Sequence, residues 1–539
     1  MKTFFICILF FILPLSLFSF DMILSGDPVL EDLRFLSLKS GRPFLSFAPP
    51  LAPAEIEKFL DSINETDLSQ SAREAYYRAR SRLAPVSRIS YADESFSLLF
   101  NINTVLEART RFNSDISWFP RYQHVTPFIS VPIRASFVNR IQLYLEPVFS
   151  MTAAEYVRGN FNTNFPIEYG HMNHEAVARA FAAAGGDWWN FQIGRDRLFW
   201  GTSHTGSLTF SDNSPHFDFA RLSLFSSTVK YSVMVTQLPL RLTPRLFNDD
   251  ERWENNINYI NTNRTTLQRY FYLRRLDFRL FNRVSIGLME GIMVGDSPFE
   301  LRYLNPLMFF HGLFAWEDFP TWGADEGHMV GSFASVEINW NITRNFAVYG
   351  QFSMNEFTLP GETDGHPNAM GWMAGIQYAH SFRNWGSVSF IEFIYTDPYL
   401  SILSTPFASF IQMDRLGNYY FIGYPRDTIA LTLGTTFFYR NILNFYGSFS
   451  WIASGQFNNN SATNGVTWDW ESGEPAINRR TPTGITENKF IFSIGSGWRP
   501  YPRLTLGANI TGIISLNNNH ISNNNQIGGQ ATFSVGFQH

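Results

Sequence analysis

LTLGANITGI, residues 504–513, alternates apolar and small polar residues with a period of two. Leu504 and Leu506 fall on one side of such a segment, and Thr505 and Asn509 fall on the other. Successive side chains of a β-strand point to opposite faces, so the pattern predicts a strand with one apolar and one polar face. The same alternation occurs in KFIFSIGSGW (489–498) and NFYGSFSW (444–451). From about residue 94 onward we therefore expect a chain of β-strands.

The connections between these strands distinguish a soluble sandwich from a membrane barrel. Seven very short turns are expected: SFVNR (136–140), LFSST (224–228), LFNR (280–283), NITRN (341–345), SFRNWG (381–386), YRN (439–441) and RPYPR (499–503). Long polar stretches separate one hairpin from the next. Outer-membrane barrels have this asymmetry, with short periplasmic turns and longer extracellular loops.

Composition points the same way. Of the 539 residues, 45% are hydrophobic, 17% are aromatic and only 16% are charged, whereas soluble domains carry about 25% charged residues. An exported chain that is rich in aromatic residues and poor in charge is typical of outer-membrane barrels. The formal net charge of -5 argues against a nucleic-acid partner.

The turns allow the strands to be counted. Seven hairpins supply fourteen strands, and a first strand near 95–109 and a last one near 528–537 bring the number to sixteen. The strand from residue 141 and the strand before residue 226 run in directions that require one more hairpin between them. We assign this hairpin to 189–198 and 205–211, with a periplasmic turn near 199–204. The expected fold is an all-β, transmembrane antiparallel β-barrel of about 18 strands, with 16 as the fallback.

The N-terminal region differs from the barrel. Residues 1–20 have the features of a secretory signal peptide, and Cys7, the only cysteine, lies within them. Without that segment the chain has no thiol for disulfides, catalysis or metal binding. Residues 21–90 contain two expected helices, one after Pro53 and one after Thr66, that would plug or cap the periplasmic end. Residues 91–539 form the expected barrel.

The C-terminal strand, QATFSVGFQH (530–539), places Phe533, Val535 and Phe537 on one face. It resembles the terminal strand that the barrel-assembly machinery recognises. The expected partners are thus that machinery and outer-membrane lipid, with the barrel a monomer.

Two long loops carry possible ligand chemistry. NHEAVARAFAAAGG (173–186) predicts a short helix in an outer loop, and His171, His174 and Glu175 beside it suggest either a metal site or local hydrogen bonding at the helix cap. In the apolar loop 295–327, Trp316 and Trp322 either belong to a packed constriction or form a platform for sugar rings.

GRDRLFWGTSHTGSLTFSDN, residues 194–213, has the densest set of reactive side chains. Ser203, His204 and Asp212 are of the residue types that form a catalytic triad. However, adjacent Ser and His side chains on a strand point apart, and no G-x-S-x-G motif is present. Arg195 and Arg197 share one strand face and are expected to point into the lumen or lie near a rim. There they brace the wall or bind an acidic ligand.

The same stretch, with RYLNPLMFF (302–310), VYGQFSMNEF (348–357), IEFIYTDPY (391–399) and IGYPRDT (422–428), resembles the capsule-assembly proteins of the Wzi-like family. In place of the glycine-and-proline pattern expected after the tryptophan, this chain has GTSH. The resemblance implies an 18-stranded barrel with a helical plug and occluding loops that acts in attaching capsular polysaccharide to the cell surface.

The function expected is therefore binding or organising a surface polysaccharide without catalysis or a cofactor. A channel for small solutes or apolar molecules is the alternative, and an outer-membrane esterase is a third hypothesis. The candidate ligand-binding residues are Arg195, Arg197, Trp200, His204, Asp212, Trp316 and Trp322.

Overall fold

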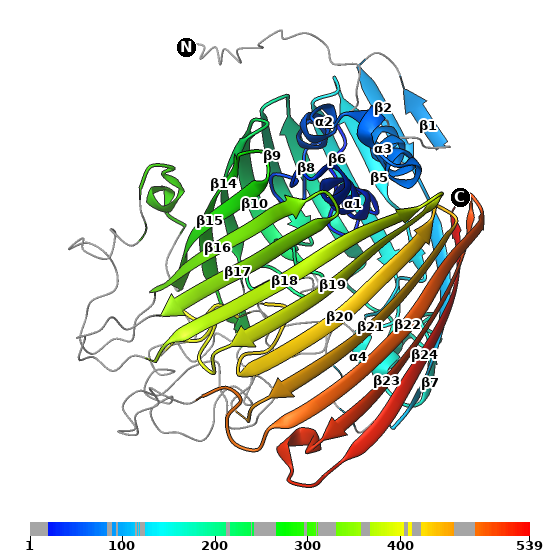
Figure 1. Ribbon diagram of the computed structural model, residues 1–539, viewed down its shortest axis with the longest axis vertical. Coiled ribbons are helices and arrows are strands. Elements are labelled where there is room, and N and C mark those ends of the chain that lie inside the picture. Colours follow the sequence, from blue (N-terminus) through cyan, green and yellow to red (C-terminus); the bar gives the residue numbers. More distant parts are fainter. Residues whose placement is uncertain are drawn as a thin grey trace, which may run out of the picture.

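The computed structural model describes residues 20–538 apart from 84–88, 93–94, 114–115, 117, 119–123, 212–215, 239, 242–265, 296–298, 309, 311–329, 357–366, 404–407, 412–421 and 457–479. Eighteen antiparallel strands form a closed barrel, and three helices lie at one end of it (Figure 1). The barrel predicted from strand alternation and turn spacing is thus confirmed.

The barrel strands follow one another around the wall in chain order. They are β2 with β3 (Phe96–Phe100 and Asn103–Phe112), β4 with β5 (Ile129–Ser130 and Ile133–Phe137), β6 (Ile141–Phe149), β8 (Val177–Gly185), β9 (Trp189–Asp196), β10 (Phe217–Phe225), β11 (Val229–Gln237), β14 (Arg269–Leu280), β15 (Val284–Gly295), β16 (Val330–Thr343), β17 (Phe346–Glu356), β18 (Ala369–Phe382), β19 (Trp385–Thr396), β20 (Thr428–Tyr439), β21 (Leu443–Ser454), β22 (Glu487–Tyr501), β23 (Leu504–Leu516) and β24 (Gln526–Gln538). The last strand, β24, pairs with β3, with Phe537 opposite Thr104. This pairing removes the open sheet edges that lipid cannot solvate.

Four shorter strands lie outside this cycle. β1 (Ile89–Ala92) pairs with β2, β7 (Phe161–Thr163) pairs with the outer half of β3, and β12 (Leu240–Arg241) pairs with β13 (Thr266–Leu267).

The barrel wall is apolar outside and polar inside. In β23, Ile510 is 52% exposed on the outer face, whereas its neighbour Thr511 is 1% exposed and faces the lumen. β18 repeats the pattern, with Trp372 and Ile376 exposed outside and Gln377 buried inside. A soluble barrel would have the opposite arrangement, so this wall is built to face lipid.

All seven predicted short turns connect neighbouring strands at one end of the barrel. The eighth hairpin is not the predicted one, because β8 turns into β9 through residues 186–188 and β9 then pairs with β10. Residues 199–211 form no strand. The number of strands is right although this hairpin was wrongly placed, because the parity argument required two strands here without depending on which segments formed them.

The predicted helix within 173–186 is also wrong, since Val177–Gly185 is the strand β8. Arg179, Phe181 and Ala183 of this strand face the lumen, and the four positions between and beside them that face outward are all alanine. The apolar–polar alternation typical of a strand is therefore not visible in the sequence. Ladder bonds to β6 and β9 on both sides override the helix propensity of alanine.

The N-terminal segment lies in the end of the barrel that has the short turns and packs against part of its wall (Figure 1). Its helices are α1 (Val29–Ser40), α2 (Pro53–Asp61) and α3 (Gln70–Arg82); α2 and α3 agree with the two expected helices, and α1 was not expected. A fourth helix, α4 (Ala153–Val157), lies in an outer loop. Within the described residues, no helix is long and apolar enough to cross a membrane.

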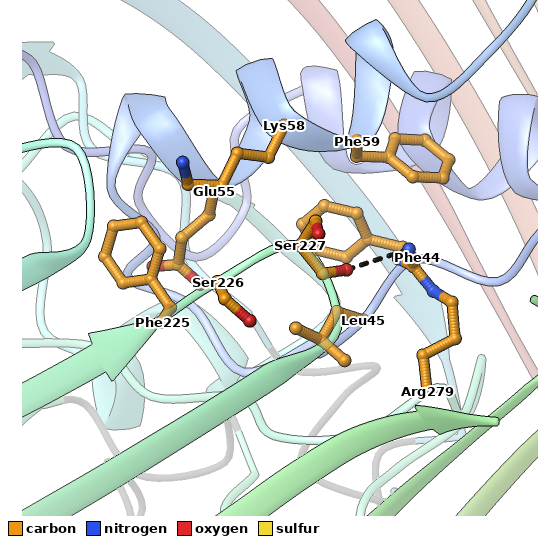
Figure 2. Close-up of a pocket in the computed structure, with 9 residues that line it drawn as sticks. All are labelled: Phe44, Leu45, Glu55, Lys58, Phe59, Phe225, Ser226, Ser227 and Arg279. Atoms are coloured by element: carbon orange, nitrogen blue, oxygen red, sulfur yellow. Dashed lines mark hydrogen bonds between the residues drawn. The ribbon is translucent and has the colours of Figure 1, made fainter.

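Direct contacts hold this plug, residues 20–83, against the wall. Lys230 of β11 forms a buried ion pair with Glu55 at 2.5 Å, and Asn341 donates to the Ser37 carbonyl at 2.6 Å. Figure 2 shows one sector of the junction, where Arg279 donates from Nη1 to the Ser227 carbonyl at 2.9 Å beneath α2. The crevice there has a volume of about 10 Å³, which holds about one water molecule.

Candidate functional site

The segment that follows β9, residues 197–211, enters the barrel lumen and packs on the plug. Trp200 is 1% exposed and donates from its indole nitrogen to the Pro49 carbonyl at 3.1 Å. The Gly201 amide donates to the Phe47 carbonyl at 2.8 Å. Leu208 and Phe210 are buried in the same apolar cluster as Trp200. We call residues 197–211 the inner segment.

Glu392 of β19 anchors the inner segment to the opposite wall. Its carboxylate accepts hydrogen bonds from the Ser203 hydroxyl at 2.8 Å and from the His204 amide at 2.9 Å. It also accepts from the Tyr349 hydroxyl at 2.9 Å and from the Thr205 amide at 3.2 Å. A buried carboxylate is stable only with such a set of donors.

His204 is held on all sides. Its ring stacks on Phe390 with 4.1 Å between the ring centroids, and Nε2 lies 3.0 Å from an Arg34 guanidinium nitrogen and 3.2 Å from the Gln377 side-chain oxygen. Burial, reinforced by the Arg34 charge, lowers the pKa of His204 well below its usual value. The imidazole is therefore neutral at physiological pH.

This geometry does not form a triad among the described residues. The carboxylate bonds to the serine hydroxyl and to the histidine backbone, whereas a triad needs it on the imidazole. The Ser203 hydroxyl also accepts from the amides of Thr205 and Gly206. Ser203 and His204 therefore shape a turn in the inner segment.

A second loop, between β19 and β20, meets the inner segment in the lumen. The Gly423 amide donates to the Ser207 carbonyl at 2.8 Å. Gly206 and Gly423 touch so closely that a Cβ on Gly206 would lie 2.8 Å from the Gly423 Cα. Together with Leu400 and Phe410 of this loop, the inner segment fills the lumen above the plug.

Of the two positions expected for Arg195, the lumen and the rim, the inward one is wrong and the structure places the residue near the rim. Arg195 lies on the same face of β9 as Phe191 and Ile193, which are exposed on the outer wall. It pairs there with Asp218 of β10 at 2.9 Å, close to the extracellular rim. Period-two alternation shows which residues share a face without showing which face is the lumen, so the pattern could not decide between them.

The charged residue that β9 points into the lumen is Asp196, which is fully buried and pairs with Arg179 at 2.9 Å. Arg197 follows the end of β9 and is half-buried, so it does not share a strand face with Arg195. Asp212, Trp316 and Trp322 lie outside the described residues.

The residues of the suggested metal site make local contacts, although the helix whose cap they were expected to form is absent, since 177–185 is a strand. His171 Nε2 lies 3.7 Å from Glu168 and 3.9 Å from Glu155, and the His174 ring packs on Tyr169. Over the part of the chain that the structure describes, no three His, Cys, Asp or Glu side chains are grouped to hold a metal ion.

Comparison with known proteins identifies the family. Residues 94–409, more than half of the chain, match the capsule assembly protein Wzi family. The Escherichia coli outer membrane protein Wzi, described as involved in group 1 capsule assembly and as a carbohydrate-binding β-barrel, superposes with a TM-score of 0.59 at 14% identity. The match covers 95% of this chain and 98% of that one.

Other solved structures match less well. Pseudomonas aeruginosa OccD3 has a TM-score of 0.43 at 8% identity, with 82% of this chain and 91% of that one covered. Acinetobacter baumannii OccAB4 has a TM-score of 0.41 at 7% identity, with 83% and 98% covered. No curated protein matches this sequence. On the match over residues 94–409, the chain belongs to the Wzi family of capsule assembly proteins.

Proposed function

We propose that this protein is a non-enzymatic outer-membrane barrel that binds or organises a capsule-like surface polysaccharide. The family match over residues 94–409 is the observation that carries the proposal. The carbohydrate binding described for the Escherichia coli barrel, which has the same fold, supports it. The absence of catalysis is supported by Ser203 and Glu392, whose hydrogen bond serves a buried turn.

The remaining parts of the proposal concern export and assembly. Residues 1–20 would be removed during export, and the barrel would function as a monomer in outer-membrane lipid. Phe533, Val535 and Phe537 would be read by the barrel-assembly machinery before β24 pairs with β3. Their shared position on the exposed outer face of β24 supports this order.

Of the candidate ligand residues, Arg195 keeps a position suited to surface contact, since it is partly exposed at the extracellular rim. Trp200 is buried and His204 is half-buried, and both hold the inner segment in place. Arg197 is half-buried beside that segment. Asp212, Trp316 and Trp322 stay sequence-based candidates.

The test is binding of the host's own surface polysaccharide to the purified barrel, immobilised in detergent. An unrelated outer-membrane barrel in the same detergent is the control. We expect saturable binding that the control lacks. Equal retention on both barrels, or none on either, would contradict the proposal.

The channel alternative is tested separately in planar bilayers. Because the inner segment and the loop around Gly423 block the lumen above the plug, we expect no steady conductance. Stable open channels from the intact protein would favour the channel.

A further inference from the structure

A polar cavity of about 310 Å³ lies in the lumen beside the seam where β3 meets β24. Its volume is at the lower end of the range of roughly 300–1,000 Å³ that ligand pockets occupy. Its lining residues come from β3, β21 to β24 and two outer loops: Glu107, His124, Thr126, Tyr156, Tyr446, Ser496, Gly507, Ala508, Asn509, Gln530, Thr532 and Ser534. We call it the seam cavity.

The solvent exposure of the lumen-facing residues shows from which end of the barrel water reaches the lumen around the seam cavity. On the outer halves of the strands, lumen-facing residues such as Thr432, Ser450 and Thr511 are buried. On the periplasmic halves of the same strands, Thr436, Asn444 and Thr505 face the lumen and are exposed. Water therefore reaches this part of the lumen from the periplasmic end.

The position of the plug explains this asymmetry. α1 and α3 pack against β18 and β19, and they reach the next strand only at its periplasmic end, where Phe35 of α1 meets Phe438 of β20 and Glu74 of α3 pairs with Arg440 among the described residues. Figure 1 shows the helices gathered near β5, β6 and β18, away from β22 and β23. The plug thus closes one sector of the periplasmic end and leaves the sector below the seam cavity uncovered.

The floor of the seam cavity has an aromatic surface. Tyr446 faces the lumen and is 38% exposed. Its ring lies over Gly495 of the neighbouring strand, where an added Cβ would come within 2.3 Å of the ring. Glycine at this position lets the ring lie along the wall. An aromatic ring that is flat against a wall presents its other face to a ligand, and apolar faces of sugar rings pack on such surfaces.

The roof holds a carboxylate with fixed geometry. Glu107 accepts a hydrogen bond from the Tyr156 hydroxyl at 2.5 Å and one from the Thr126 hydroxyl at 2.8 Å. A carboxylate has about four acceptor sites, so acceptor capacity is left for a further hydroxyl. Asn509, whose side-chain oxygen is buried without a partner, and Thr532 line the wall between roof and floor.

The charge of the lining selects among ligands. Of the described residues that line the seam cavity, Glu107 carries the only formal charge when His124 is neutral. Hydroxyl and amide groups supply the other polar atoms, so the lining matches neutral sugar hydroxyls.

We propose that the seam cavity binds a neutral sugar unit of a glycan that enters from the periplasmic side, with Tyr446 stacking on the ring and Glu107, Asn509 and Thr532 bonding its hydroxyls. The inference rests on the proposed function and adds to it a lumenal site distinct from the outer surface. It assigns the protein a contact with glycan on the periplasmic face of the membrane.

The first test compares variants in solution. The probes are the intact surface polysaccharide of the host and oligosaccharides of two to six sugars released from it by mild acid. Tyr446→Ala and Asn509→Leu change the seam cavity. Thr505→Val is the matched control, because Thr505 faces the lumen on β23, as Asn509 does, but does not line the cavity. We expect the first two variants to weaken oligosaccharide binding at least tenfold and the control to bind as the wild type does.

Wild-type affinity in both cavity variants would overturn the inference. So would failure of the wild type to bind the oligosaccharides while it binds the intact polysaccharide, and in either case the proposed function stands. Failure of the wild type to bind either probe removes both. Heat-dependent migration on SDS gels checks that each variant is folded.

A second test measures whether bound oligosaccharide protects a thiol in the seam cavity, so it does not depend on a variant that loses binding. The chain has no cysteine beyond Cys7, so Ser534→Cys, at a lining residue outside the proposed sugar contacts, and Thr505→Cys each place one thiol in the lumen. Bound oligosaccharide should slow maleimide labelling at position 534 and leave labelling at position 505 unchanged. Equal rates at both positions with and without oligosaccharide would contradict the inference.

Discussion

Glu392 connects the inner segment to the barrel wall at a single buried carboxylate. Ser203, the His204 backbone and Tyr349 all donate to it. Hydrogen bonds to a charged group contribute about 1.5–3 kcal/mol each, and donors left without a partner carry a further cost. We expect Glu392→Ala to lower the free energy of unfolding by about 3 kcal/mol or more.

Urea titration of the barrel in lipid vesicles measures this change. Glu392→Gln, which keeps one acceptor oxygen, is the matched variant and should lose about half as much. An unchanged urea midpoint for Glu392→Ala would show that the inner segment does not depend on this residue.

His204 makes stability depend on pH. Its folded-state pKa lies well below 6.5, because the ring is buried and next to Arg34. Above pH 6.5 the ring is neutral in both states and contributes no pH dependence. Below it the unfolded chain binds a proton that the folded chain does not, so the free energy of unfolding falls by up to about 1.4 kcal/mol per pH unit.

Urea titrations at pH 8.0, 6.5 and 5.0 compare the wild type with His204→Gln. The difference between the two proteins should change between pH 6.5 and 5.0 and stay constant above that range. Parallel curves over the whole range would mean that the pKa of His204 is the same in the folded and unfolded protein, which contradicts the prediction.

For single residues, the sequence indicates which side chains are unusual better than it indicates what those side chains do. Trp200 and His204 were selected as candidate ligand-binding residues, whereas in the structure they hold the inner segment through Pro49, Arg34 and Phe390, which are distant in the chain. A pattern of neighbours cannot include such contacts. For Arg195 the sequence left only one point undecided, namely which face of β9 lies on the outside of the barrel.

Among the elements, β8 shows how composition and context compete. Alanine is the best helix former, and its methyl group gives almost no hydrophobic contrast between the two faces of a strand. The small side chain is used on the lumenal face, where Ala183 packs with Phe20, Met22 and Ala52 of the plug. The turns were predicted well because their hydrogen bonds join residues that are neighbours in the chain. The inner segment was not predicted, since its backbone groups bond to partners that are distant in the chain.

The strand assignment gives a paired prediction at Ala182 and Ala183. Ala183→Leu overfills the contact between wall and plug and should cost about 1–3 kcal/mol. Ala182 lies opposite Ile193 on the outer face, so Ala182→Leu should be neutral. Urea midpoints and trypsin cleavage of the plug measure both. Equal effects at the two positions would contradict the alternation of β8.

The whole molecule combines a predictable wall with contents that the sequence reveals only in part, since α2 and α3 were expected and the inner segment was not. Alternation, turn spacing and parity depend on neighbouring residues, so they identified 18 strands. The plug, the inner segment and the loop around Gly423 meet through contacts between regions hundreds of residues apart, such as the bond from Gly423 to Ser207. How the lumen is closed therefore had to come from the structure.

The closure predicts one-sided access to the lumen. Asn444 faces the lumen near the periplasmic end and is exposed, whereas the inner segment and the loop around Gly423 lie between it and the outside. We expect Asn444→Cys to react with a membrane-impermeant maleimide after the periplasm is opened and not on intact cells. Ser522→Cys, in the exposed loop between β23 and β24, is the control and should react on intact cells. Labelling of both positions from outside would mean that the lumen is open across the membrane.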